Sequence, residues 1–139
     1  MSVTVNQLLA NAREKLERIS PEQAFAEQQD GALIVDIRPQ AQRERSGEVP
    51  GALVIERNVL EWRFDPTCDA KVAEAIHHDV RILVLCQEGY TSSLAAAALQ
   101  EIGLRNATDI VGGLRAWREA GLPVTAGGTE PGDRVSQPA

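Results

Sequence analysis

The stretch that decides the fold runs from Arg81 to Ser93 and reads RILVLCQEGYTSS. Its residues 82–85 are apolar without alternation, which is typical of a strand buried on both faces of a sheet. Cys86 follows at once, then a glycine-containing loop and a predicted helix from residue 92. The stretch therefore predicts a thiol in the loop between the carboxyl end of a buried strand and the amino end of a helix.

The rest of the chain repeats this alternation of strands and helices. Three more short apolar runs occupy residues 32–35, 52–55 and 107–111. Helical patterns are predicted over residues 39–46, 69–78, 92–102 and 113–120, and a further helix begins at Ser20 and ends before Asp30. Strands alternating with helices indicate an α/β fold, with a central parallel β-sheet flanked by helices on both faces. Such folds bind ligands beyond the carboxyl ends of the strands.

The length of 139 residues fits a single globular domain with additions at both ends. Residues 4–19 carry apolar side chains at spacings of three and four, so we expect residues 1–19 to form a helical extension. Residues 20–125 form the predicted domain. From Ala126 the chain is rich in glycine and proline, and we expect residues 126–139 to be a disordered tail.

Composition excludes several classes of protein. The net charge is −6 and no basic patch stands out, so we expect no nucleic-acid partner. No apolar run is long enough to span a membrane and the chain does not open on a leader-like pattern, so we expect a cytoplasmic protein that is a monomer or homodimer. With only Cys68 and Cys86, a disulfide-rich scaffold is excluded, and both thiols are expected to be reduced.

Cys86 is the candidate reactive group. Unpaired backbone N–H groups and the dipole at the start of a helix favour an anion there, and hence a thiolate. Gly89 allows the loop to curl so that successive N–H groups point inward. The alternative is a buried structural cysteine, but a strand, a cysteine, a glycine loop and a helix in series favour a nucleophile. No spacing of cysteine and histidine supports a metal site.

Five motifs in order resemble the rhodanese family of sulfurtransferases, over about residues 20–124. The first is an Asp-x-Arg at Asp36 and Arg38. The others are the turn at residues 47–52, the Cys-x-x-Gly-x-Thr-Ser loop at 86–92, the Gly-Gly-x-x-x-Trp segment at 112–117 and the Gly-Leu-Pro-Val ending at 121–124. Each is weak alone, but their common order makes the resemblance specific.

The resemblance implies that Cys86 takes sulfane sulfur from thiosulfate or a persulfide donor, becomes a persulfide, and passes the sulfur to a thiol or to cyanide. It implies no metal or organic cofactor. The persulfide would lie in a cradle formed by the loop residues Gln87, Glu88, Gly89, Tyr90, Thr91 and Ser92. The alternative is a sulfur-carrier or regulatory binding module without efficient turnover of a free donor.

The loop differs from that of related phosphatases and from the usual rhodanese pattern. Phosphatases that resemble this fold use a longer Cys-x5-Arg loop, but here Ser92 takes the place of the arginine, so phosphatase activity is not expected. Glu88 puts a carboxylate at the mouth of the site, which predicts weak use of the thiosulfate dianion. Glu48 replaces a histidine of the family turn, which we interpret as a surface change.

Further candidates lie at the same edge of the predicted sheet. Arg57 and Arg63 follow the second strand, and we expect at least one of them to face the pocket and bind an anionic donor. Trp62 lines the pocket or packs, packing being the commoner role. Asp36 and Arg38 are expected to form a structural ion pair at a strand end rather than to take part in catalysis. The hydroxyl groups of Thr91 and Ser92 either cap the helix or bond to the sulfur.

Overall fold

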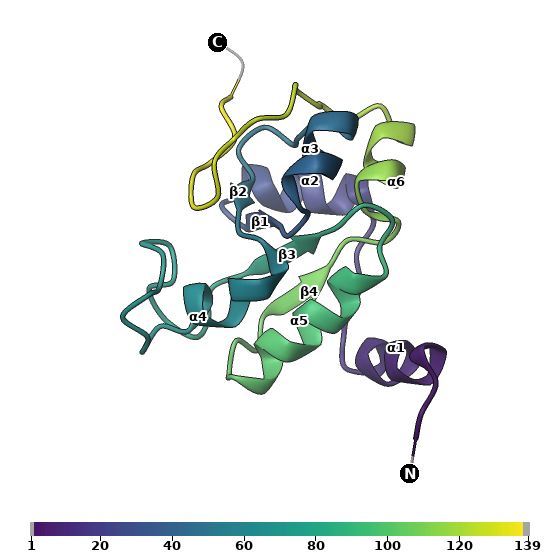
Figure 1. Cartoon of the computed structure of the whole chain (residues 1–139), viewed down its shortest axis with the longest axis vertical. Helices are drawn as coiled ribbons and strands as arrows, with labels where there is room; N and C mark the ends of the chain where they lie inside the picture. The colour runs from purple at the N-terminus through teal and green to yellow at the C-terminus, as the bar shows by residue number, and fades with distance from the viewer. Residues whose placement is uncertain (1, 138–139) are drawn as a thin grey trace.

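The computed structural model describes residues 2–137. Its centre is a four-stranded sheet with the strand order β2-β1-β3-β4, and every neighbouring pair is parallel (Figure 1). The strands are β1 (Leu33–Asp36), β2 (Leu53–Val54), β3 (Ile82–Leu85) and β4 (Ala107–Asp109). The predicted fold class is confirmed, and each strand lies within about a residue of an apolar run.

Helices cover both faces of the sheet because its strands are apolar on both. One face packs against α4 (Leu60–Phe64) and α5 (Thr91–Glu101), and α1 (Val5–Glu14) lies against α5 (Figure 1). The other face packs against α2 (Pro21–Gln29) and α6 (Gly113–Glu119), while α3 (Gln40–Ser46) connects β1 to β2. Side chains alternate between the two cores along each strand, so Val35 enters the first core and Ile34 the second.

The register brings three strand ends to one edge. Asp36, the last residue of β1, is paired with Leu85, and Asp109, the last residue of β4, is paired with Val84. Cys86 follows Leu85 directly, so the loop after β3 begins between the ends of β1 and β4. This edge is where ligands bind in parallel α/β sheets.

The helix predicted over residues 69–78 is wrong. That segment is irregular, and the helical turns after β2 come earlier, as a 3-10 turn at Arg57–Val59 followed by α4. Pro66 cannot continue a helix, and the Asp65 carboxylate accepts the Thr67 N–H over 2.9 Å in a side-chain turn. Val72 of this irregular segment packs into the first hydrophobic core.

The N-terminal helices match the capping signals, though not every boundary. Thr4 and Gln7 form a capping box, and the Ser20 hydroxyl accepts the Gln23 N–H over 3.1 Å. The first helix ends at Glu14 rather than at residue 19, and residues 15–19 cross to β4. None of the helices within residues 2–137 has both the length and the apolar composition to cross a bilayer.

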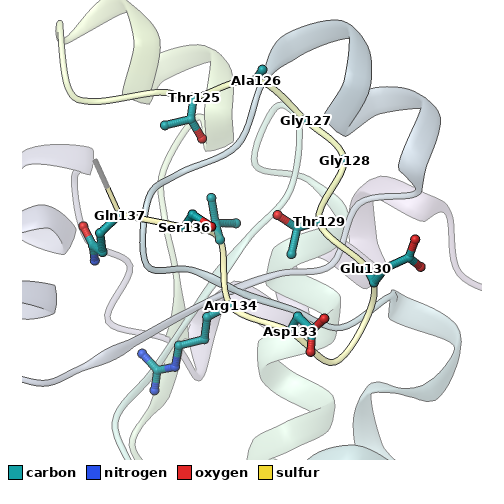
Figure 2. A pocket seen from close by; sticks show the side chains of 11 residues that line it. Thr125, Ala126, Gly127, Gly128, Thr129, Glu130, Asp133, Arg134, Ser136 and Gln137 are labelled. Atoms are coloured by element: carbon teal, nitrogen blue, oxygen red, sulfur yellow. The ribbon is translucent and has the colours of Figure 1, made fainter. Parts of the chain in front are cut away.

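The C-terminal segment corrects the prediction of a disordered tail. Residues 126–137 follow the edge of the molecule beside β2, and Arg134 forms an antiparallel bridge with Leu53 (Figure 2). Val135 is buried in the second core, its N–H donates to the Ala52 carbonyl over 2.8 Å, and its own carbonyl accepts from Gly51. An edge strand offers unpaired backbone groups, which a segment poor in apolar residues can still satisfy. Residues 138–139 lie outside the described residues.

Candidate functional site

Cys86 occupies the expected place, in the loop between β3 and α5. The residue is 3 % exposed, and its Sγ accepts the backbone N–H of Gly89 over 3.2 Å and that of Ser92 over 3.3 Å. Gly89 has φ +86°, and a Cβ there would lie 2.6 Å from the Gly112 backbone nitrogen. Only glycine fits this close approach without strain. The loop thus turns backbone donors onto the sulfur, which is how a site stabilises an anion without a metal.

A pocket of about 330 Å³ opens beside the sulfur. Its lining comprises Cys86, Gln87, Glu88, Tyr90 and Thr91 from the loop, Ile37, Arg38 and Pro39 from the end of β1, and Gln42 and Arg57. The pocket therefore opens a path to Cys86 for a small ligand from the side of α3 and the turn after β2.

A larger hollow of about 670 Å³ lies elsewhere, enclosed by the turn of the C-terminal segment (Figure 2). Residues 125–130 and 133–137 form its whole lining, and neither Cys86 nor any other cysteine or histidine is among them. The smaller pocket is the candidate site, because that one holds the thiol.

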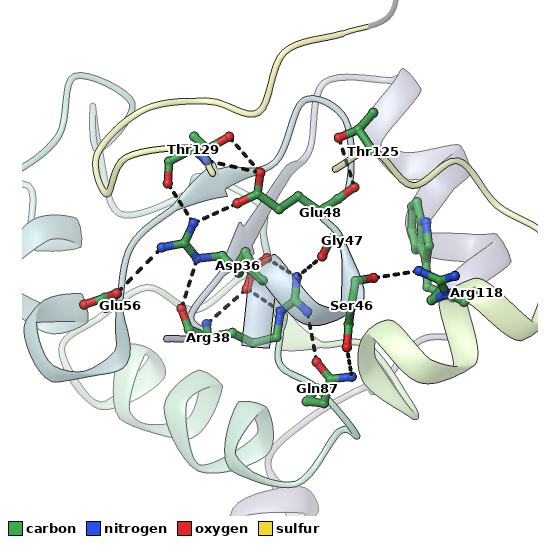
Figure 3. A network of polar contacts seen from close by, with 12 residues as sticks. Asp36, Arg38, Ser46, Gly47, Glu48, Glu56, Gln87, Arg118, Thr125 and Thr129 are labelled. Carbon is green, nitrogen blue, oxygen red and sulfur yellow. Dashed lines mark hydrogen bonds and ion pairs between the residues drawn. The ribbon is translucent and has the colours of Figure 1, made fainter. Parts of the chain in front are cut away.

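Asp36 and Arg38 form the predicted ion pair. Both side chains are fully buried, and the guanidinium binds the carboxylate through two bonds, Nε to Oδ1 over 3.0 Å and Nη2 to Oδ2 over 2.7 Å. Arg38 Nη1 also donates to Gln87 Oε1 over 2.9 Å, and Gln87 Nε2 donates to the Ser46 hydroxyl (Figure 3). The pair thus anchors the residue that follows the cysteine.

Glu48 corrects the prediction of a surface change. It is fully buried and accepts Arg43 Nη1 over 2.7 Å and the Thr129 hydroxyl over 2.8 Å (Figure 3). Burial by itself would raise the pKa of the Glu48 carboxyl, but the bonds from Arg43 and Thr129 outweigh it and hold the pKa below its usual value. Because Thr129 lies in the C-terminal segment, that segment completes the burial of the pair.

The three residues considered for substrate binding, Arg57, Arg63 and Trp62, occupy different places. Arg57 lines the pocket, and its Nη1 donates to Glu61 over 2.8 Å. Arg63 instead donates to the Ala70 carbonyl, and neither it nor Trp62, which is 60 % exposed, is among the pocket-lining residues. Binding of a donor by Arg57 stays a prediction.

The loop hydroxyl groups do not behave alike. Ser92 gives its N–H to the sulfur, but its Oγ donates to Asp109 Oδ2 over 2.7 Å. Ser93 Oγ donates to the same oxygen over 2.8 Å, while Thr91 lines the pocket. The Ser92 hydroxyl therefore serves neither of the two roles predicted for it.

Sequence reasoning missed Asp109 and the two arginines, Arg13 and Arg18, that contact the loop beside it. Arg18 forms an ion pair with the buried Asp109 over 2.9 Å, and Arg18 and Arg13 both donate to the Gly89 carbonyl. One signal was available: a lone acidic residue inside a predicted buried strand needs a cation or several donors. The partners of Asp109 could not be identified from the sequence, because they are distant in it. Arg18 lies 91 positions from Asp109, Ser93 lies 16 positions away and Ser92 lies 17 positions away.

Comparison with known proteins gives a consistent result. Residues 20–120 match the family model described as rhodanese-like domain. The thiosulfate sulfurtransferase GlpE of Pseudomonas entomophila is 36% identical over 118 residues, covering 82% of this chain and 95% of that protein.

Solved structures agree on the fold. A Rhodopseudomonas palustris protein of unknown function, described as a possible tyrosine phosphatase, is 31% identical with a TM-score of 0.81, covering 89% of this chain and 96% of that one. A thiosulfate sulfurtransferase from Pseudomonas aeruginosa, at 23% identity and a TM-score of 0.64, covers 84% of this chain and 21% of its own.

Proposed function

This chain belongs to the rhodanese-like domain family, and on that premise we propose that it is a sulfurtransferase in which Cys86 carries sulfane sulfur as a persulfide. The observation that carries the proposal is the pair of N–H groups, from Gly89 and Ser92, that meet the Cys86 sulfur at 3.2 and 3.3 Å beside an open pocket. The same donors can hold the thiolate and the terminal sulfur of an anionic persulfide.

The proposed reaction has two displacement steps. In the first, the Cys86 thiolate attacks the outer sulfur of the donor, a new S–S bond forms, and the donor's own bond to that sulfur breaks. With thiosulfate, sulfite leaves with the electron pair. In the second, a thiolate or cyanide attacks the terminal sulfur of the persulfide, and Cys86 leaves as a thiolate. Neither step needs a net oxidant or a general base once the thiol is ionised.

The pocket favours some donors over others. Arg38 is engaged by Asp36 and Gln87, and Arg57 by Glu61, so the cations at the pocket are already paired. Glu88 adds a carboxylate, which forms an exposed ion pair with Arg115 over 3.2 Å that solvent screens. A small dianion such as thiosulfate gains little in such a pocket, whereas a polysulfide, an organic persulfide or a protein persulfide brings less charge or its own binding surface.

A carrier module is the second candidate, because Glu88 weakens the case for turnover of a free anionic donor. In that case Cys86 accepts sulfur from a partner protein and keeps it until a second partner takes it. The two candidates differ in whether a free donor is turned over repeatedly.

Phosphatase activity is not proposed, although a solved structure with 31% identity is described as a possible tyrosine phosphatase. A cysteine phosphatase needs a guanidinium at the end of its loop to bind phosphate with two bonds. Ser92 and Ser93 occupy that end here, and both direct their hydroxyl groups to Asp109. We expect no hydrolysis of phosphate monoesters that depends on Cys86.

We place this chemistry in a reducing compartment such as the cytoplasm, with a sulfur donor and a thiol acceptor as partners. The support is that Cys68 and Cys86 are both free cysteines. A persulfide relay needs its thiols reduced between turnovers.

Intact mass spectrometry tests the proposal. Parent protein, Cys86→Ser and Cys68→Ser are exposed to thiosulfate or to inorganic polysulfide, and then to cyanide. We expect the parent and Cys68→Ser to gain one sulfur atom, faster from polysulfide, and to lose it as thiocyanate. Cys86→Ser should gain none. Loading with little repeated turnover would favour the carrier module, and no adduct from either donor would refute the persulfide.

A further inference from the structure

Two residues outside the range matched by the family model bind the loop that holds the sulfur. The Gly89 carbonyl accepts Arg13 Nη2 over 2.8 Å and Arg18 Nη2 over 2.9 Å. Arg13 belongs to α1 and Arg18 to the segment after it, and both precede residue 20, where the family match begins. We propose that Arg13 and Arg18 are positioning residues that hold the Cys86 loop in its anion-binding conformation.

The position of the Gly89 carbonyl matters because of its neighbours in the backbone. In a trans peptide the carbonyl and the following N–H point in opposite directions, so a carbonyl drawn toward two guanidinium groups turns the Tyr90 N–H the other way. The N–H of Gly89 itself bonds to the Cys86 sulfur. Glycine has the greatest conformational freedom of any residue, so this turn needs restraint from its surroundings.

The guanidinium groups are themselves fixed. Arg18 binds Asp109 through Nε over 2.9 Å and Nη2 over 3.2 Å, and the Asp109 side chain is fully buried. Arg13 Nε donates to the Ser93 hydroxyl over 3.1 Å, and its guanidinium lies 5.8 Å from the centre of the Tyr90 ring. Two arginines therefore contact the loop, and one of them, Arg18, is paired with a carboxylate, that of Asp109.

This arrangement has an electrostatic consequence for the sulfur. Arg13 and Arg18 bring two positive charges to the back of the loop, and Asp109 offsets one of them. The remaining positive charge favours an anion in the cradle and opposes the effect of Glu88 at the mouth. The sequence predicted compensation from Arg57 or Arg63; the contacts assign it to the N-terminal segment.

The proposal is tested on a reaction that does not require sulfur transfer. In a Cys68→Ser background, Cys86 is alkylated with iodoacetamide at neutral pH. Arg13→Met should lower the alkylation rate about fivefold, because the thiolate loses one charge-assisted restraint on its cradle. Lys15→Met is the matched control. It removes the same charge from the same region, where Lys15 Nζ lies 3.8 Å from Glu101 on α5, and its rate should stay within twofold of the parent.

A conservative variant separates positioning from folding. Arg13→Lys keeps the charge but replaces the two nitrogens that bond to Ser93 and Gly89 with a single ammonium group, so its rate should fall between those of the parent and Arg13→Met. Arg18→Met would also leave the buried Asp109 without its cation, so Arg13 carries the test. Circular dichroism of Arg13→Met and Lys15→Met should agree. Equal alkylation rates in these two variants would overturn the proposal.

The sulfur-transfer rate is measured in parallel, because the effect on catalysis rests on the proposed function. We expect Arg13→Met to lower kcat for sulfur transfer from polysulfide and to leave KM nearly unchanged, since Arg13 is not among the pocket-lining residues. If the parent protein transfers no sulfur but Arg13→Met is still alkylated slowly, the proposed function is refuted and the positioning role of Arg13 is supported. If the parent transfers sulfur and Arg13→Met matches Lys15→Met in both assays, only the positioning role of Arg13 is refuted.

Discussion

Replacing Glu48 with glutamine tests whether this residue is buried, as in the structure, or exposed, as expected from the sequence. Glu48 and Arg43 have side chains that are 1 % and 0 % exposed and lie 2.7 Å apart. Removing one partner of such a pair leaves the other charge buried without its close counter-ion, which costs about 3–5 kcal/mol. Glu56, whose carboxylate lies 3.7 Å from Arg43 Nη2, offsets part of that cost when Glu48 is replaced. Glutamine keeps an acceptor for the Thr129 hydroxyl, so we expect the free energy of unfolding to fall by about 3 kcal/mol. For a domain of this size that lowers Tm by roughly 10 °C.

Urea unfolding followed by tryptophan fluorescence measures the change, because Trp117 is fully buried and reports on the core. Glu44→Gln is the matched control, since Glu44 is exposed on α3, where its carboxylate accepts from Gln40. That control should change the free energy by no more than about 0.5 kcal/mol.

The pH dependence gives a second measure of the same pair. The pKa of Glu48 is lower in the folded protein than in the unfolded chain, so its contribution is fully present above about pH 5. It is lost as the pH falls through the folded-state pKa. The difference in stability between the parent and Glu48→Gln should therefore be constant near neutrality and shrink in acid.

A double-mutant cycle decides whether the pair acts as a unit. Arg43→Met alone leaves the Glu48 carboxylate buried without its cation, whereas Arg43→Met with Glu48→Gln leaves no buried charge. The double variant should be less destabilised than the sum of the two single changes by about 2 kcal/mol. If Glu48→Gln unfolds like Glu44→Gln, or the two changes add, the buried pair is refuted and Glu48 behaves as a surface residue.

Three further outcomes are expected. Val135→Ala should lower the free energy of unfolding by about 2 kcal/mol in urea, while Val3→Ala, at a side chain 62 % exposed, should have almost no effect; equal values would mean that the C-terminal segment is detached. Gly89→Ala should lower the rate of sulfur transfer more than tenfold, because the added Cβ would lie 2.6 Å from the backbone nitrogen of Gly112. Gly31→Ala is its control: Gly31 has φ +104° and no atom within 4 Å of the added Cβ, so this variant should lose stability without losing sulfur transfer. Glu88→Gln should lower the KM for thiosulfate about threefold at low salt and hardly at all at high salt, and a salt-independent change would point to packing instead of charge.

The strands and the Cys86 loop were predictable because their signals are local. A continuous apolar run such as Ile82–Leu85 has few alternatives to a buried parallel strand, and the cysteine, glycine and helix start that follow it are adjacent in the sequence. The capping residues Thr4 and Ser20 also act within three positions. Local chemistry of this kind needs no knowledge of the tertiary fold.

The failures have a common cause in partners that are distant in the sequence. Glu48 looked like a surface residue because its burial depends on Thr129, 81 positions later. The tail looked disordered because one buried valine and a row of backbone bonds to β2 leave almost no compositional signal. Likewise, the spacing of Val72 and Ala75 fits a helix face as well as a loop that returns to the core. In each case a tertiary contact overrode the local pattern.

The two strands that flank β3 support the sulfur loop in the same way. β1 and β4 each end in a buried aspartate, and each aspartate binds an arginine that also reaches the loop: Arg38 contacts Gln87, and Arg18 contacts Gly89. The loop is thus held on both sides of Cys86 by groups that are already paired before any donor arrives. A cradle fixed in advance does not have to reorganise when an anion forms in it, which is the condition under which backbone donors stabilise charge most effectively.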